Sequence, residues 1–228
     1  AFAVSPDGDS IFLLVASQQP NNYLLTSIST SDWSQRVQVT VTMSATRAAL
    51  LPSSDGRRVY LVPIGEQQIS AYDTEAARRQ AIFVIGEPIR DARLSADGRQ
   101  LYVLGERRET PMVVDTSAGS TVTTLLDRSA ASAFAGANRL LYAERYTGRW
   151  LCVLQPAAQQ VSFIDLRQRN VHTVSVGREP SAMAYDPHGD VLFVANRGSN
   201  TLTLISLSNA EVIDTIDVRS RPVQLALQ

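Results

Sequence analysis

The chain has 228 residues and a formal net charge of −1, and 44% of its residues are hydrophobic. This length suits a single all-β domain, and the near-zero charge removes any global attraction to nucleic acid or to an anionic membrane. No apolar stretch approaches the roughly 18 residues of a membrane span. The single cysteine excludes an internal disulfide and a cysteine-rich zinc site.

A repeated turn-and-strand unit organises the sequence. Each unit opens with a short turn that contains a glycine, and an apolar run of β-forming residues follows, as in Ser95 to Leu104. The spacings of 48, 42, 50 and 41 residues between turn glycines are typical of propeller blades of four strands. The glycines are Gly8, Gly56, Gly98, Gly148 and Gly189. No segment shows helical periodicity, so we predict an all-β fold.

A polar residue closes another apolar run 17 residues after four of the five turn glycines. The residues are Asp73, Asp115, Asp165 and Ser206, whereas the first unit reaches Ser29 only after four extra residues within Ser17 to Asn22. A carboxylate at a strand end can accept N–H bonds from the next turn. We therefore predict structural roles for the three aspartates, with a catalytic or metal role as the less favoured alternative because the repeat places them on separate blades.

We expect one β-propeller domain over residues 1–228, with repeats at about 1–47, 48–90, 91–139, 140–180 and 181–220. In the last repeat, strands are expected at 181–185, 191–195, 201–207 and 211–218.

Residues 221–228 align with strand one of a sixth unit and are predicted to form a closing strand. Its companion strands are expected from missing upstream residues or from another chain, because an open blade face would leave about ten apolar side chains in water. The domain is thus expected to be incomplete at its N-terminus and part of a seven-bladed ring. A six-bladed ring and a self-contained five-bladed ring are the alternatives.

The run Leu192 to Asn196, preceded by Asp186 to Gly189 and followed by Asn200 to Ile205, resembles the YVTN-type β-propeller repeat. That repeat is akin to surface-layer and lactonase-type propellers. Two further segments carry the pattern, Leu101 to Leu104 and Val161 to Asp165, and Gly177 to Pro180 resembles its blade boundary. The first unit departs most from the pattern. The resemblance implies a bacterial protein in the periplasm or outside the cell. It does not imply one activity, because such repeats serve enzymes, electron-transfer partners, surface proteins and recognition modules.

In a propeller blade, the loops from strand two to three and the connections from strand four to the next strand one lie on one face, here called the loop face. Both length irregularities, 17–22 and 128–138, fall on it. The loop face also collects the arginines that we predict to bind a ligand or partner: Arg90, Arg107, Arg108, Arg128, Arg178, Arg197 and Arg221, with Arg219 beside them. Glutamates are interspersed: Glu66, Glu87, Glu106, Glu109 and Glu179. If these arginines converge, they form a site for a carboxylate, a phosphate or an acidic protein surface; a solvated rim of mixed charge is the alternative.

No catalytic residue, metal site or cofactor is predicted. His172 and His188 have no visible nucleophile partner, and phosphate-loop, dinucleotide and zinc-protease motifs are absent from the sequence. Cys152 is expected at a buried strand position, and Arg93 and Glu144 are expected to pair across blades. Nucleic-acid binding is not expected, since no basic stripe carries interleaved aromatic residues.

The favoured interpretation is a non-enzymatic propeller that binds a protein partner or a small anionic ligand on its loop face. The resemblance also implies two alternatives. The first is an enzyme, either a lactonase or isomerase acting on sugar acids or the propeller subunit of a dehydrogenase. The second is a structural domain of a longer surface protein.

Overall fold

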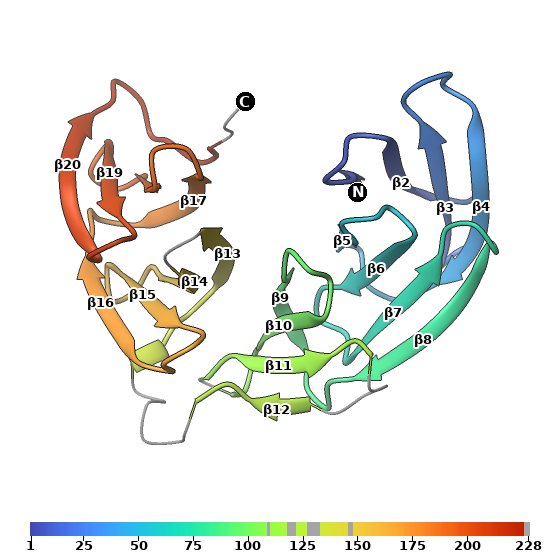
Figure 1. The fold of residues 1–228 in the computed structure, drawn as a ribbon, viewed down its shortest axis with the longest axis horizontal. Coiled ribbons are helices and arrows are strands. Elements are labelled where there is room, and N and C mark those ends of the chain that lie inside the picture. Colours follow the sequence, from blue (N-terminus) through green and yellow to red (C-terminus); the bar gives the residue numbers. More distant parts are fainter. Residues whose placement is uncertain (109, 118–121, 127–132, 146–147, 226–228) are drawn as a thin grey trace. The chain divides into compact units, whose positions relative to one another are not determined.

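The computed structural model describes residues 1–108, 110–117, 122–126, 133–145 and 148–225. These residues form five antiparallel sheets of four strands each (Figure 1), and the described part of the chain contains no α-helix. In every sheet the strands lie in chain order, which is the arrangement of a propeller blade. The predicted all-β propeller fold is therefore confirmed. The chain divides into two compact units: unit 1 holds Ala1–Arg107 and Met112–Thr123, and unit 2 holds Arg108–Pro111 and Thr124–Gln228.

Unit 1 contains sheets A, B and C. Sheet A comprises β1 (Phe2–Val4), β2 (Ser10–Ala16), β3 (Asn22–Ser29) and β4 (Gln35–Thr42). Sheet B comprises β5 (Ala48–Pro52), β6 (Arg58–Pro63), β7 (Gln68–Asp73) and β8 (Arg78–Val84). Sheet C comprises β9 (Ile89–Leu94), β10 (Gln100–Gly105), β11 (Met112–Asp115) and β12 (Val122–Thr124).

Unit 2 contains sheets D and E. Sheet D comprises β13 (Arg139–Arg145), β14 (Gly148–Gln155), β15 (Gln160–Asp165) and β16 (Val171–Ser175). Sheet E comprises β17 (Pro180–Asp186), β18 (Val191–Asn196), β19 (Thr201–Ser206) and β20 (Glu211–Asp217), each within a residue of its predicted bounds. Residues 221–225 lie in no strand, and 226–228 lie outside the described residues, so the closing strand stays a prediction.

The turn between strands one and two of sheet B is held by one serine. The hydroxyl of Ser53 donates to Asp55 Oδ1 (2.6 Å) and accepts from the amide of Arg58 (3.0 Å). The hydroxyl of Thr74, just beyond strand three, donates to the carbonyl of Gly56 (2.8 Å). The same bonds recur in the turns that begin at Ser5 and Ser95, with Thr30 and Thr116 as the threonines. Strands one, two and three are thus joined at one point in each sheet of unit 1.

Two of the five predicted turn glycines have different roles from those expected. Gly8, Gly56 and Gly98 have φ of +79°, +63° and +70°, where a side chain is disfavoured. Gly148 instead lies in β14, and the left-handed residue after Gly189 is Asp190, with φ of 57°. Because Asp186 pairs with Val191 across the hairpin, the turn of sheet E ends at Asp190.

The aspartates that close strand three have the structural role predicted for them. Asp73 Oδ1 accepts the amides of Glu75 and Ala76 at 2.9 and 2.8 Å. Asp115 and Asp165 accept amides of their own following turns in the same way. Each carboxylate therefore stabilises a turn.

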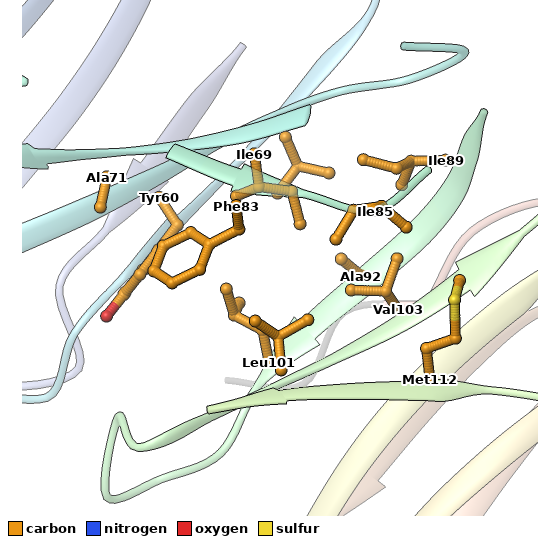
Figure 2. Packing of buried hydrophobic residues seen from close by; sticks show 12 residues of the cluster. Tyr60, Ile69, Ala71, Phe83, Ile85, Ile89, Ala92, Leu101, Val103 and Met112 are labelled. Atoms are coloured by element: carbon orange, nitrogen blue, oxygen red, sulfur yellow. The ribbon is translucent and has the colours of Figure 1, made fainter. Parts of the chain in front are cut away.

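The core of unit 1 includes a cluster of twelve buried residues between sheets B and C, shown in Figure 2. Tyr60 and Phe83 of sheet B pack there with ring centroids 6.1 Å apart, facing Leu101 and Met112 of sheet C. In unit 2, Cys152 is fully buried in the core of sheets D and E, as predicted, and burial raises the pKa of its thiol.

The insertion at 17–22 does not lengthen a loop as expected. Pairing of β2 with β3 continues to Ala16 and Tyr23, so most of the extra residues extend these two strands. The second irregularity covers residues 128–138, of which 128–132 lie outside the described residues. Its last part rests on sheet D, where the carbonyl of Ala133 accepts from Gln155 Nε2 (2.7 Å) and Ser162 Oγ (3.2 Å).

Replacing Gly98 tests the repeated turn. Gly98→Ala is expected to lower the free energy of unfolding by about 1–2 kcal/mol, because an alanine is strained in the left-handed region. The melting temperature should then fall by about 2–8 °C. Gly98→Asn is the control and should cost less, since asparagine tolerates this conformation; equal losses for both variants would contradict the interpretation.

Acid should destabilise the protein through its turn carboxylates. Hydrogen bonds from Ser34 lower the pKa of Asp32 to about 2, and hydrogen bonds from Ser53 and from the amide of Ala76 lower the pKa values of Asp55 and Asp73 below their ordinary 3.8. A lowered pKa in the folded state contributes stability above the unfolded value, and this is lost as pH falls. Thermal melts from pH 6 to pH 2 should show the loss beginning near pH 4, and a smaller loss in Asp73→Asn.

Candidate functional site

A buried glutamate orders the loop face of sheet C. Glu87, in the connection that leads into β9, accepts the amide of Arg107 in the β10–β11 loop (2.7 Å) and is only 3% exposed. Gly105 leaves the space for it, because a Cβ there would lie 2.3 Å from the carboxyl carbon of Glu87. The side chain therefore joins the connection and the loop of one sheet.

Sheet E repeats this arrangement with an exposed pair. Glu179, before β17, accepts from the Nε and Nη2 of Arg197 at 3.2 and 3.0 Å. Backbone bonds reinforce the contact, since Arg197 N donates to Glu179 O (3.1 Å) and Gly198 N to Arg178 O (2.9 Å). The connection into β17 and the β18–β19 loop are therefore one ordered surface.

Glu66 makes a third link, in sheet B. Its Oε1 accepts the amides of Ser44 and Ala45 at 2.6 and 2.7 Å, so here the glutamate comes from the strand-two-to-three loop and reaches the connection. The sequence analysis placed Glu66, Glu87 and Glu179 only among the charges of the face. A repeated sequence feature marks two of these glutamates: a Glu-Pro pair occurs where strand one begins in sheets C and E, at 87–88 and 179–180.

The structure places three of the seven predicted arginines at one end of sheet E, in unit 2. Arg178 and Arg197 lie on the two hydrogen-bonded loops, and Arg221 precedes Pro222, whose carbonyl accepts from Ser181 Oγ at the start of β17 (2.9 Å). All three side chains are exposed. We call this group the arginine end of sheet E.

Three of the other predicted arginines lie in sheet C or its β10–β11 loop. Arg90 lies half-buried in β9 and Arg107 lies exposed in the β10–β11 loop, both in unit 1. Arg108 is exposed and belongs to the short segment of that loop assigned to unit 2. Arg128 lies outside the described residues.

The arginine end of sheet E carries an excess of positive charge. Arg219 adds a fourth guanidinium, whereas Glu179 and Asp217 are the carboxylates at the same end of the sheet. Glu179 already holds Arg197 at 3.0 Å, with both side chains more than half exposed. Because exposed single pairs contribute little in water, this surface suits a ligand with several carboxylates better than one with a single charge.

Arg93 and Glu144, which were predicted to pair with each other, each have a partner within their own sheet. Arg93 Nη1 lies 2.7 Å from Asp91 Oδ1 on its own strand, and Glu144 Oε1 lies 2.6 Å from Arg149 Nε on the adjacent strand. Each of these two residues therefore pairs with an oppositely charged residue that lies close to it within the same sheet.

The two histidines lie in a strand of sheet D and in a turn of sheet E. His172 is in β16 beside the ring of Trp150, and His188 is in the exposed turn after Asp186. Within the described residues, no three histidine, cysteine, aspartate or glutamate side chains are grouped to hold a metal ion.

Cavities in unit 1 lie on the opposite side from the loop face, at the turns that join strands one and two. One of about 420 Å³ lies between sheets B and C, and one of about 150 Å³ lies between sheets A and B. Sequence reasoning placed ligand binding on the loop face and gave no sign of these cavities. Their walls combine side chains from neighbouring sheets, which spacing along one strand does not reveal.

Comparison with known proteins supports the fold. No family model and no curated protein sequence matches the chain. A functionally unknown protein from Desulfotomaculum acetoxidans DSM 771 has a similar structure, with a TM-score of 0.72 and 15% identity over 95% of this chain and 69% of that one. The β-propeller domain of Cps50 (Swd1) from Myceliophteria thermophila is also similar, with a TM-score of 0.69 and 14% identity over 94% of this chain and 67% of that one.

These comparisons define the protein as a β-propeller, and at such identities they show the fold alone. Among the described residues, no helix has the length and apolar character needed to cross a membrane.

Substituting Glu87 tests the loop-face link. Glu87→Gln keeps the shape but removes the charge from the bond to Arg107, so we expect the free energy of unfolding to fall by about 1–3 kcal/mol. Hydrogen exchange at the Arg107 amide should quicken. Glu106→Gln, an exposed change in the same loop, is the control and should leave both measurements unchanged; an unaltered Arg107 amide in Glu87→Gln would refute the link.

Proposed function

We propose that this propeller is a non-enzymatic binding module that holds an acidic segment of a partner protein at the arginine end of sheet E. The observation that carries the proposal is the placement of Arg178, Arg197 and Arg221, all exposed, beside hydrogen-bonded loops. The family resemblance adds the proposal that the partner is met in the periplasm or outside the cell.

Physical reasons favour a segment with several carboxylates. Guanidinium groups bind carboxylates through paired hydrogen bonds, and loops that are already ordered lose less entropy when a partner binds. Arg197 is partly engaged by Glu179, so its hydrogen bonds must be shared with the incoming carboxylate. A small anion would engage fewer arginines and gain less.

Titration with acidic peptides tests this function. A hexaglutamate peptide should bind to the protein in calorimetry at low salt and weaken steeply as salt rises. The triple change Arg178→Gln, Arg197→Gln and Arg221→Gln should reduce affinity at least tenfold.

The control is the double change Arg167→Gln and Arg169→Gln, which removes exposed arginines from the strand-three-to-four turn of sheet D and should have little effect. Tighter binding of citrate or phosphate than of the peptide would favour the small-ligand alternative. Equal losses in the triple variant and the control would refute the site.

A second proposal concerns the outer faces of sheets A and E. Strands β6 and β10 are buried on both faces over five successive residues, whereas β2 and β18 alternate along much of their length. In β2, Phe12 and Leu14 are buried while Ile11 and Leu13 are half-buried and Val15 is 54% exposed. We propose that a further four-stranded blade covers each half-open face.

Dye binding and mass measurements test this covering. The 228-residue chain alone should bind 8-anilinonaphthalene sulfonate, because the dye reports accessible apolar surface. Leu13→Thr and Phe193→Thr should reduce the fluorescence with little loss of stability, whereas Leu192→Thr, in the buried core, should lower stability strongly. A monomer by light scattering that binds no dye would contradict the proposal.

A further inference from the structure

The pocket of about 150 Å³ between sheets A and B has a distinct chemistry. Sheet A contributes hydroxyl groups and one guanidinium, and the turns of both sheets contribute carboxylates. The lining residues that matter are Ser10, Ser27, Arg36, Asp7, Asp55 and Glu75. None of them was singled out by the sequence analysis.

The pocket exists because sheet A has small residues at two register positions. The register of strands two and three shows which positions are equivalent in sheets A and D. Ser10 of β2 corresponds to Trp150 of β14, and Ser27 of β3 corresponds to Phe163 of β15. In unit 2 those two aromatic side chains belong to the core between sheets D and E. The two serines leave the corresponding space in unit 1 open.

One wall group is buried without a partner. Ser27 is only 5% exposed, and its hydroxyl makes no hydrogen bond to any described residue. The neighbouring hydroxyls of Ser10 and Ser29 instead accept from Arg36 at 3.3 and 2.9 Å. A buried hydroxyl without a partner favours a ligand that completes its hydrogen bonds.

The carboxylates of the pocket exceed its available positive charge. Asp7, Asp9, Asp55 and Glu75 line it with two arginines. Arg57 pairs with Glu75 at 3.5 Å, and Arg36 is held by the serines. Asp7 and Asp55 use their Oδ1 atoms within their own turns, and their Oδ2 atoms accept no hydrogen bond from a described residue.

Asp7 and Asp55 both line the pocket, and Asp7 lies close to the turn of sheet B. Asp7 Oδ2 lies 3.5 Å from where a Cβ on Gly56 would be, which places it against the turn that holds Asp55. The charge of Asp55 works to raise the pKa of Asp7, although the hydrogen bond from Ser5 is the larger effect and keeps that pKa low. Both carboxylates thus remain ionised at neutral pH.

We propose that this pocket binds the ammonium or guanidinium group of an organic cation, with Asp7 and Asp55 as acceptors and Ser27 as the buried hydroxyl partner. The volume fits such a head group and is well below the several hundred Å³ of a pocket for a whole drug-sized ligand. The adjoining cavity of about 420 Å³ shares Asp55, Arg57 and Glu75, so the body of the ligand extends there.

Methylguanidine and putrescine are the small probes, followed by nuclear magnetic resonance titration of the intact chain. Both should bind saturably, whereas methylurea, the neutral analogue of methylguanidine, should not. A triarginine peptide separates the two sources of this chemistry: tighter binding of the peptide than of the small amines assigns the pocket to a basic side chain of a partner, and the reverse assigns it to a free amine.

Three variants locate the binding. Ser27→Leu should fill the pocket and abolish binding, and Asp55→Asn should weaken it at least tenfold. Asp186→Asn is the matched control, because it removes an aspartate of the corresponding turn in sheet E, where Asp186 accepts turn amides but lines none of these cavities. Circular dichroism confirms that each variant is folded.

Three results would overturn the proposal. The first is no saturable binding of either amine. The second is binding that survives Ser27→Leu in a folded protein. The third is competition by sodium or calcium alone, which would indicate an inorganic cation. If Asp55→Asn does not fold, Ser27→Leu and the methylurea comparison still decide the question.

Discussion

In unit 1, one serine holds each turn between strands one and two through its hydrogen bonds. The joining of strands one, two and three in each sheet depends on these bonds. In sheet B, Ser53 joins the aspartate of its turn to the first amide of β6, while Thr74 ties the far end of β7 to the same turn. Neighbouring turns also stack: a Cβ on Gly56 would meet Ser5, and one on Gly98 would meet Ser53, at 3.7 and 3.8 Å. This stacking sets the spacing between sheets at the turn side and therefore the size of the cavities there.

Carboxylates have different tasks at the two ends of these sheets. At the turn end, the aspartates accept hydrogen bonds from their own turns, which lowers their pKa values and keeps them ionised. At the loop face, Glu66, Glu87 and Glu179 reach across to a second segment and order it. The same chemical group thus produces an acidic cavity at one end and, in sheet E, an ordered surface rich in arginine at the other.

The sequence was sufficient for the local part of the fold. Strand bounds in sheet E and the roles of Asp73, Asp115 and Asp165 follow from alternation and turn chemistry, which act within a few residues. It was insufficient where a partner is distant in the chain. The link from Glu87 to Arg107 spans 20 residues, and the pairing of Arg93 with Asp91 was missed because spacing alone does not rank competing partners. Among the predicted arginines, Arg178 and Arg197 lie on two loops that backbone hydrogen bonds join.

The repeats differ in how well they pack their cores, as equivalent positions of sheets A and D show. In sheet D the aromatic side chains of Trp150 and Phe163 pack into the core between sheets D and E. Sheet A keeps serines at both positions, which forfeits apolar burial and leaves one hydroxyl without a partner. Stability alone favours filling this space, since the repeat shows that the same backbone accepts larger residues. A cavity with polar walls in such a position is better explained by a ligand that restores the missing contacts than by packing.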